Sequence, residues 1–346
     1  MKGLRLARSA RVCPAGGGRW PRYLALLALL CGAVLSCDRA PSGGELVLYT
    51  SIDEPVARPI IQEYERNSGV KVVLVTDTEA SKSIGLAERL RAEKDRPRCD
   101  VWWGNEPFHT IRLAEEGLFA PFDSPSAGDV LPLYRDRHQR WVGNGLRARV
   151  IICSSHDSNS LNRLDELPAF AGQSAMARPT AGTTAGHVAA LYEVWGTERA
   201  DAFFRALREG GITLLGGNGP VAEAVAGGRF RFGLTDNDDV AHVARHNNSI
   251  TFRIPPVDST IDGTLMIPTT VALVAKPTEN PHARSLVDYL LSSDVERKLI
   301  EARFAGWSVR GGDTQPPAMQ IDYVQVARRL PEAIRRATAI LDARAP

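Results

Sequence analysis

Three segments decide the fold of this chain: ELVLYTS at residues 45–51, VKVVLVT at 70–76 and DVWWG at 100–104. Each is a short run rich in β-branched or aromatic residues, which predicts a buried strand. A segment with apolar residues at helical spacing follows each strand, over residues 54–67, 79–94 and 107–116. This alternation of strands and helices predicts a parallel, doubly wound α/β sheet.

A second α/β unit is expected further along the chain. RARVIICS (147–154) is its first strand, the segment 174–178 follows, and later strands are expected at residues 212–215, 230–234 and 251–254. TLMIPTTVALVA (264–275) forms one more strong strand. Helices follow it, and the last of them covers residues 323–343.

This order predicts two α/β lobes, and we expect them to consist of residues 45–146 plus 264–310 (lobe 1) and of residues 147–263 (lobe 2). The helix over 323–343 is expected to pack back on the lobes. The chain passes between the lobes at 147–154 and at 253–264, which predicts a two-strand hinge. Ligands of open α/β sheets bind beyond the carboxyl ends of the strands, so a binding site is expected in the cleft between the lobes.

The first 36 residues are predicted to be a targeting segment. Six basic residues and no acid precede an apolar run at 23–35, which is too short to span a bilayer comfortably. The run ends at VLSC (34–37), which resembles a lipobox. We therefore expect cleavage before Cys37, lipidation of Cys37, and a flexible tether over 37–44 that leads to the folded region. An ordinary cleavable signal is the alternative interpretation.

Composition excludes some classes of partner. The chain has 346 residues, of which 44% are hydrophobic and 24% charged, as in ordinary globular proteins. The formal net charge is +2, and removing the six positive charges of the targeting segment leaves about −4 on the rest. An acidic folded region argues against nucleic acid as a partner. We expect an exported, periplasmic monomer that is held at the membrane by its lipid.

The folded region contains two of the five cysteines, Cys99 and Cys153. An oxidising compartment permits a disulfide between them, but the sequence does not show whether they lie within bridging range. Two buried free thiols are the expected state.

Polar residues follow the expected strands at the edge where a ligand is predicted. The candidate binding residues are Ser51, Asp53, Thr78, Glu79, Glu106, Thr183, Thr184, Asn218, Asp236, Asp238 and Asp239. Each of them taken alone has a simpler interpretation as a helix N-cap or first-turn residue. As a set they indicate more, because several carboxylates in one cleft repel each other unless a cation binds or some are protonated.

Two kinds of ligand fit such a set. Oxygen-rich clusters without cysteine suit hard cations. The helix starts at Thr183, Thr184 and Asn218 can instead present backbone N–H groups to an anion.

The run over residues 46–122 resembles bacterial extracellular solute-binding proteins of the ferric-iron-binding type, as do RPTAGTTAGHVAAL, GNGPVAEAVAGG, GLTDNDD and GTLMIPTTVALV. The resemblance implies the type II periplasmic-binding-protein fold and a role beside an ABC permease and its ATPase. It also implies that Glu106 stands at an iron-ligating position and Asp53 at a position that is histidine in some members. Thr183, Thr184 and Asn218 match the region that holds a synergistic anion.

The main departure from the family concerns a pair of adjacent tyrosines that bind ferric iron. Asp238 and Asp239 stand at those positions. The expected metal ligands are therefore Glu106, Asp238 and Asp239, with iron(III) as the leading ligand, with or without a synergistic anion. Another metal, a small organic cation or a phosphorylated solute are the alternatives, and no catalytic cofactor is expected.

Catalytic motifs are missing from the sequence. It contains no GxSxG, no HExxH and no P-loop lysine. We therefore predict a binding protein and not an enzyme. A sensor that feeds a membrane receptor would have the same sequence features as an importer subunit, so that alternative stays open.

Overall fold

The computed structural model describes residues 45–77, 84–180 and 182–343, which belong to one compact unit. The targeting segment, the tether with Cys37, and the candidate residues Thr78 and Glu79 lie outside the described residues. None of the helices in the described part is both long enough and apolar enough to cross a bilayer.

The sheet of the first lobe contains the three strands that begin the folded region. β1 (Leu46–Thr50) pairs in parallel with β2 (Val72–Thr76) and β3 (Val101–Gly104). β10 (Met266–Val274) pairs antiparallel with β3, with the short β4 (Phe119–Ala120) and with β5 (Val142–Ser154). The helices of this lobe are α2 (Glu54–Ser68), α3 (Ile84–Ala92), α4 (Pro107–Glu115), α8 (Ala283–Leu290) and α9 (Ser293–Glu301).

Helix α2 illustrates why the sequence forms these elements. Pro55 lies in its first turn, where a missing N–H costs nothing. Ala57, Ile60, Ile61 and Tyr64 form its buried face. Gly69 ends the helix with φ of 72°, a left-handed conformation that glycine adopts without strain.

The sheet of the second lobe continues from β5. β8 (Phe232–Asp236) and β9 (Ile250–Arg253) pair antiparallel with β5, and β6 (Ser174–Ala177) lies parallel to β8 and β7 (Thr213–Leu215). The helices are α5 (Gly182–Glu209), α6 (Asn218–Ala226) and α7 (Asn237–Ala244). Gly196 interrupts α5 with φ of 74°. Short 3-10 turns lie at Pro125–Ala127, Pro132–Tyr134, Ser155–Asp157 and Leu164–Gln173.

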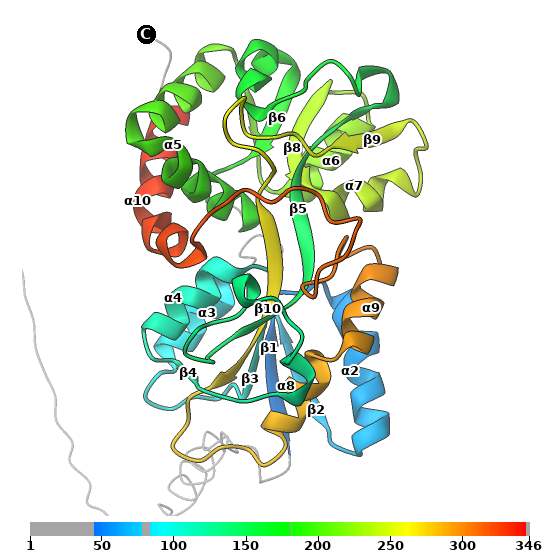
Figure 1. The fold of residues 1–346 in the computed structure, drawn as a ribbon, viewed down its shortest axis with the longest axis vertical. Coiled ribbons are helices and arrows are strands. Elements are labelled where there is room, and N and C mark those ends of the chain that lie inside the picture. The colour runs from blue at the N-terminus through cyan, green and yellow to red at the C-terminus, as the bar shows by residue number, and fades with distance from the viewer. Residues whose placement is uncertain (1–44, 78–83, 181, 344–346) are drawn as a thin grey trace, which may run out of the picture. The chain divides into compact units, whose positions relative to one another are not determined.

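Strand β5 is shared by both sheets. Its residues up to Ala148 pair with β10, and from Arg149 onward they pair with β8 and β9. The chain returns beside this point, where the Arg149 N–H donates to the Leu265 carbonyl at 3.0 Å. β5 and the start of β10 thus run together from one lobe to the other (Figure 1).

A second interlobe connection lies beside these strands. Helix α10 (Tyr323–Leu341) packs against α4 and α5, with Arg328 paired to Glu115 at 2.5 Å and Arg336 paired to Asp201 at 2.5 Å. Figure 1 shows α4, α5 and α10 on one side of β5 and β10, and α2, α7 and α9 on the other. This packing joins the lobes on the side away from α2 and α7.

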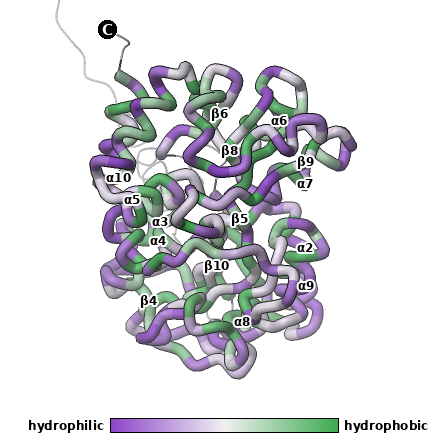
Figure 2. The backbone as a smooth tube through the Cα atoms, turned by 45° about the horizontal axis from the view of Figure 1, so that its top comes forward, coloured by the Kyte–Doolittle hydropathy of each residue, from purple (hydrophilic) through white to green (hydrophobic). Residues whose placement is uncertain are grey.

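The core is apolar and runs through both lobes. Outer turns are mainly hydrophilic, whereas inner strands and helix faces are hydrophobic (Figure 2). Cys99 and Cys153 are buried free thiols, which confirms the state expected from the sequence. Burial raises the pKa of both thiols, so neither behaves as a reactive thiolate.

Candidate functional site

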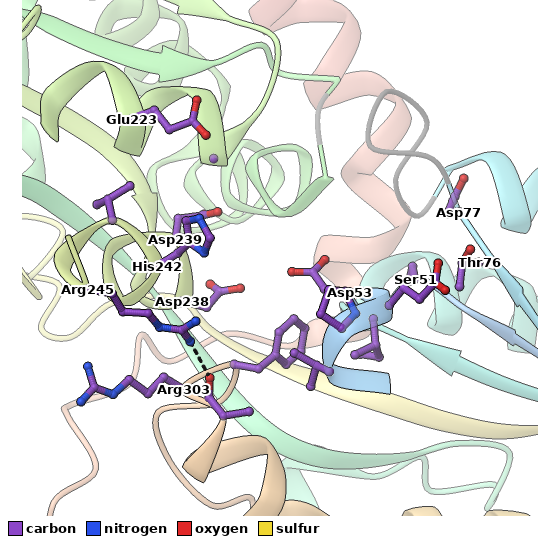
Figure 3. A pocket seen from close by; sticks show the side chains of 18 residues that line it. Ser51, Asp53, Thr76, Asp77, Glu223, Asp238, Asp239, His242, Arg245 and Arg303 are labelled. Carbon is purple, nitrogen blue, oxygen red and sulfur yellow. Dashed lines mark hydrogen bonds between the residues drawn. The ribbon is translucent and has the colours of Figure 1, made fainter. Parts of the chain in front are cut away.

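A cleft of about 480 Å³ lies between the lobes. One wall comes from the ends of β1 and β2 and from the end of α9, and the other comes from α6 and α7. Its polar lining residues are Ser51, Asp53, Glu54, Thr76, Asp77, Glu223, Asp238, Asp239, His242, Arg245 and Arg303 (Figure 3). Carboxylates outnumber cations among these lining residues, so the lining is acidic.

Strand ends position the carboxylates on the two walls. Asp53 follows β1 at the N-cap position of α2, and its side chain makes no capping hydrogen bond there. Asp238 and Asp239 lie in the first turn of α7, directly after β8. In Figure 3 the carboxylates of Asp53 and Asp238 point toward each other across the gap.

The first turn of α7 gathers three carboxylates. Oxygen atoms of Asp236, Asp238 and Asp239 lie within 4.8 Å of one another, a spacing that suits a metal ion. Asp239 also has a structural role, because its Oδ2 accepts from Thr235 Oγ1 at 2.9 Å and from the Asp236 N–H at 3.4 Å. The capping interpretation and the binding interpretation therefore apply to the same residue.

Two arginines that sequence reasoning missed lie behind these acids. Arg149 is 1% exposed, and its Nη1 donates to Asp236 Oδ1 at 2.7 Å, to Asn218 Oδ1 at 3.1 Å and to Thr183 Oγ1 at 3.4 Å. Arg147 is 3% exposed, and its Nη1 reaches Asp238 Oδ2 at 3.1 Å and Asp236 Oδ2 at 3.4 Å.

The sequence carried a signal for these arginines. Arg147 and Arg149 are two residues apart on an otherwise apolar strand, so their side chains lie on the same face. Charged residues are almost never buried without partners. The pattern RAR in a core strand therefore predicts buried acids opposite it, and Asp236 is that acid.

The predicted anion region forms a buried hydrogen-bonded group at the starts of α5 and α6. Thr183 Oγ1 donates to Asp236 Oδ2 at 2.5 Å, Thr184 Oγ1 donates to Asn218 Oδ1 at 2.8 Å, and Asn218 Nδ2 donates to Thr183 Oγ1 at 2.7 Å. Nε and Nη2 of Arg149, one edge of its guanidinium, have no hydrogen-bond partner among the described residues. Such an edge matches the geometry of a carboxylate or phosphate.

His187 lies on the first turns of α5 beside Arg149. Burial, together with the nearby Arg149 guanidinium, lowers the pKa of His187 well below its usual range. The imidazole is therefore neutral, and Arg149 supplies the positive charge at this position.

Glu106 lies at the N-terminus of α4 and faces inward. Its carboxylate accepts from the Phe108 N–H at 2.7 Å and from the His109 N–H at 3.0 Å, and only 3% of the residue is exposed. Burial raises the pKa of Glu106 to about 7, against the effect of these N–H donors. In this arrangement Glu106 is a helix cap, and its role as a metal ligand stays a prediction.

The candidate residues therefore divide into two layers. Ser51, Asp53, Asp238 and Asp239 line the cleft. Behind them lie Glu106, Thr183, Thr184, Asn218 and Asp236, which form hydrogen bonds among themselves and with Arg147, Arg149 or the start of α4.

Further lining residues were not singled out from the sequence. His242 lies four residues after Asp238 on α7, so both residues face the same side of the helix. Glu223 comes from α6. The sequence could have indicated His242, because it lies at helical spacing from the acids of the DNDD segment.

The sequence of this chain is similar to known solute-binding proteins. The model of the bacterial extracellular solute-binding protein family matches residues 46–304. The Fe(3+)-binding periplasmic protein of Serratia marcescens is 26% identical over 216 residues, which are 61% of this chain and 62% of that protein. An uncharacterized protein of Haemophilus influenzae is 25% identical over 109 residues, or 30% of its length. The match thus spans less than two thirds of these curated relatives.

Solved structures give a longer match. Iron-bound HitA from Pseudomonas aeruginosa superposes with a TM-score of 0.74 at 20% identity, covering 85% of this chain and 99% of that one. AfuA from Actinobacillus pleuropneumoniae, with exogenous fructose-6-phosphate bound, gives 0.72 at 16% identity, covering 88% of this chain and 100% of that one. At these identities the likeness concerns the fold alone, and it confirms the type II periplasmic-binding-protein fold predicted from the sequence.

Proposed function

The chain belongs to the bacterial extracellular solute-binding protein family, and we propose that it is the substrate-binding subunit of an ABC importer for a cationic solute, with iron(III) as the leading candidate. In this proposal the periplasmic protein takes the solute into the interlobe cleft and delivers it to a permease. Lipidation of Cys37 would hold the protein at the membrane.

The carboxylates of the cleft carry the proposal. The oxygens of Asp236, Asp238 and Asp239 lie within 4.8 Å of one another, and Asp53 faces Asp238 from the opposite lobe (Figure 3). Carboxylate oxygens are suitable ligands for a hard cation. The Fe(3+)-binding relative from Serratia marcescens supports iron(III). Asp238 and Asp239 stand where the family resemblance implies a tyrosine pair, so the ligands proposed here are carboxylates.

The two facing walls of the cleft also suggest that the lobes close on the ligand. β5 and the start of β10 connect the lobes, so a small rotation about them brings Asp53 nearer to Asp238. A cation between the two walls removes the repulsion between these carboxylates and favours closure.

The test is a titration with iron(III) supplied from a weak chelator. The double change Asp238→Asn, Asp239→Asn removes two ligands and keeps the volume of both side chains, so we expect the affinity to fall at least about 100-fold. Small-angle scattering of the same samples should show compaction of the wild-type protein on saturation and none in the variant.

The matched control removes two exposed acids that do not line the cleft. Asp294→Asn, Glu209→Gln changes the net charge equally, and these side chains pair with Arg297 and Arg208 at the surface. This control should bind as the wild type does. An Asp238, Asp239 variant that binds iron(III) like the control would contradict the proposal.

One observation favours a second candidate, a phosphorylated solute. The empty edge of Arg149 lies where α5 and α6 begin, and helix N-termini attract anions. Inorganic phosphate is the probe for this candidate. Binding that is lost in Arg149→Leu and kept in Asp238→Asn, Asp239→Asn would favour it over the cation.

A further inference from the structure

We propose that Arg147 determines the charge selectivity of the cleft, because it competes with a cationic ligand for the carboxylate of Asp238. This inference rests on the proposed binding of a cation in the cleft. It assigns to Arg147 a role in specificity that is distinct from direct contact with the solute.

The position of Arg147 supports this role. Its Nη1 lies 3.1 Å from Asp238 Oδ2 and 3.4 Å from Asp236 Oδ2, so it touches two of the three carboxylates of the possible metal cluster. The guanidinium of an arginine stays protonated in proteins, and Arg147 is 3% exposed beside these two acids. Arg147 is therefore a permanent cation within the carboxylate cluster.

The same side chain also contacts the first lobe. Its Nη2 donates to the backbone carbonyl of Asn105, and its guanidinium lies over the Phe304 ring at 5.0 Å from the ring centre. Phe304 is part of the cleft wall. These contacts hold the guanidinium in one place, so it does not simply swing away when another cation arrives.

A fixed positive charge next to the ligand has a predictable consequence. Repulsion between two cations grows in proportion to the charge of the incoming ion. Arg147 therefore weakens the binding of a trivalent ion more than that of a divalent ion of similar size. An ion whose charge is partly neutralised by its own anionic ligands escapes most of this penalty, so the cleft favours a complexed cation over a bare trivalent one.

The test compares Tb³⁺ with Ca²⁺, two oxygen-seeking ions of similar size and different charge. Arg147→Gln removes the fixed charge and keeps a polar side chain. We expect the ratio of Tb³⁺ to Ca²⁺ affinity to rise about tenfold in this variant. A loss of structure alone would change both affinities together and leave the ratio unaltered. Arg147→Met, whose thioether still packs on Phe304, is the second neutral variant if the glutamine does not fold.

Arg284→Gln is the charge-matched control. Arg284 is exposed, pairs with Glu279 at 2.8 Å and does not line the cleft, so solvent screens it and the ratio should change less than about threefold. Arg147→Lys retains the charge and should keep the wild-type ratio. An unchanged ratio in both neutral variants, or a raised ratio in the lysine variant, overturns the inference.

Asp238→Asn separates this inference from the proposed function. If Asp238→Asn weakens Tb³⁺ and Ca²⁺ binding but the neutral Arg147 variants leave the ratio unchanged, only the inference fails. If Asp238→Asn changes the binding of neither ion, the proposed cation site and the inference about Arg147 both fail.

Discussion

Two arginine–carboxylate clusters of the protein, each centred on a buried acid, differ in how completely their hydrogen bonds are formed. In lobe 1, Glu296 accepts from the N–H groups of Gly145 and Val309, from Ser308 Oγ and from Arg310 Nη1, at 2.6 to 3.0 Å. The remaining nitrogens of Arg310 donate to Asp129 Oδ1 and to the carbonyls of Ser126 and Leu291.

The cleft cluster is incomplete by comparison. Asp236 is paired with both Arg147 and Arg149, yet Nε of Arg147 and Nε and Nη2 of Arg149 have no partner among the described residues. A buried donor without a partner costs free energy unless a ligand or water supplies an acceptor. We infer that the first cluster stabilises the fold, whereas the second keeps buried donors that a ligand or water can still satisfy.

The largest expected effect comes from breaking the complete cluster. Glu296→Ala leaves Arg310 and two buried N–H groups without their acceptor, so the free energy of unfolding should fall by about 3–5 kcal/mol. Urea denaturation measures this free energy of unfolding. The control Glu301→Ala removes an exposed acid of the same helix, paired with Arg297, and should cost less than about 1 kcal/mol. Equal losses in the two variants would show that the complete cluster is not stabilising.

Ionisation of Glu106 is expected to have a smaller effect on the free energy of unfolding. Glu106 borders the cleft cluster and has no ion-pair partner among the described residues. Its pKa is about 7 in the folded state against an ordinary value of 4.5, so the folded protein binds the proton more tightly. The contribution of Glu106 to the free energy of unfolding should therefore be greatest below pH 4.5. It should be lost as the pH rises through 7, which lowers the free energy of unfolding by up to about 3 kcal/mol.

Glu106→Gln isolates this contribution, because the amide does not ionise. The wild type should lose stability relative to the variant between pH 5 and pH 8 in urea denaturation. Parallel stability curves for the two proteins across this range would contradict the raised pKa.

The smallest expected effect on stability comes from the incomplete cluster. Arg149→Leu breaks the Nη1 ion pair with Asp236 but also removes two buried donors that lack partners, and Asp236 keeps its contacts with Arg147 and Thr183. We expect a loss below about 2 kcal/mol, less than for Glu296→Ala. A loss as large as that of Glu296→Ala would mean that both clusters serve the fold equally.

The sequence predicted the fold well because the strands are short, apolar and bounded by turn residues. β1, β2 and β3 lie where ELVLYTS, VKVVLVT and DVWWG predict them. The start of β5 was missed: the strand begins at Val142, because VGNG has no apolar alternation and pairs with β10 only through tertiary contacts.

The candidate site was predicted less completely, for a physical reason. Strand ends identify which residues reach the edge of a sheet, so Asp53, Asp238 and Asp239 could be proposed from the sequence. Strand ends do not show which way a side chain turns, and Glu106 turns toward the N–H groups of its own helix. Partners from the middle of another strand, such as Arg147 and Arg149, follow only from the tertiary pairing of β5 with β8.

We propose that the interlobe cleft holds a cationic solute through the carboxylates of α7. Elemental analysis combined with native mass spectrometry of the protein purified without chelators tests it most directly. We expect about one equivalent of metal, with iron as the leading candidate, in the wild type and its loss in Asp238→Asn, Asp239→Asn. A wild-type protein that carries an anionic organic solute and no metal, unchanged in that variant, would contradict it.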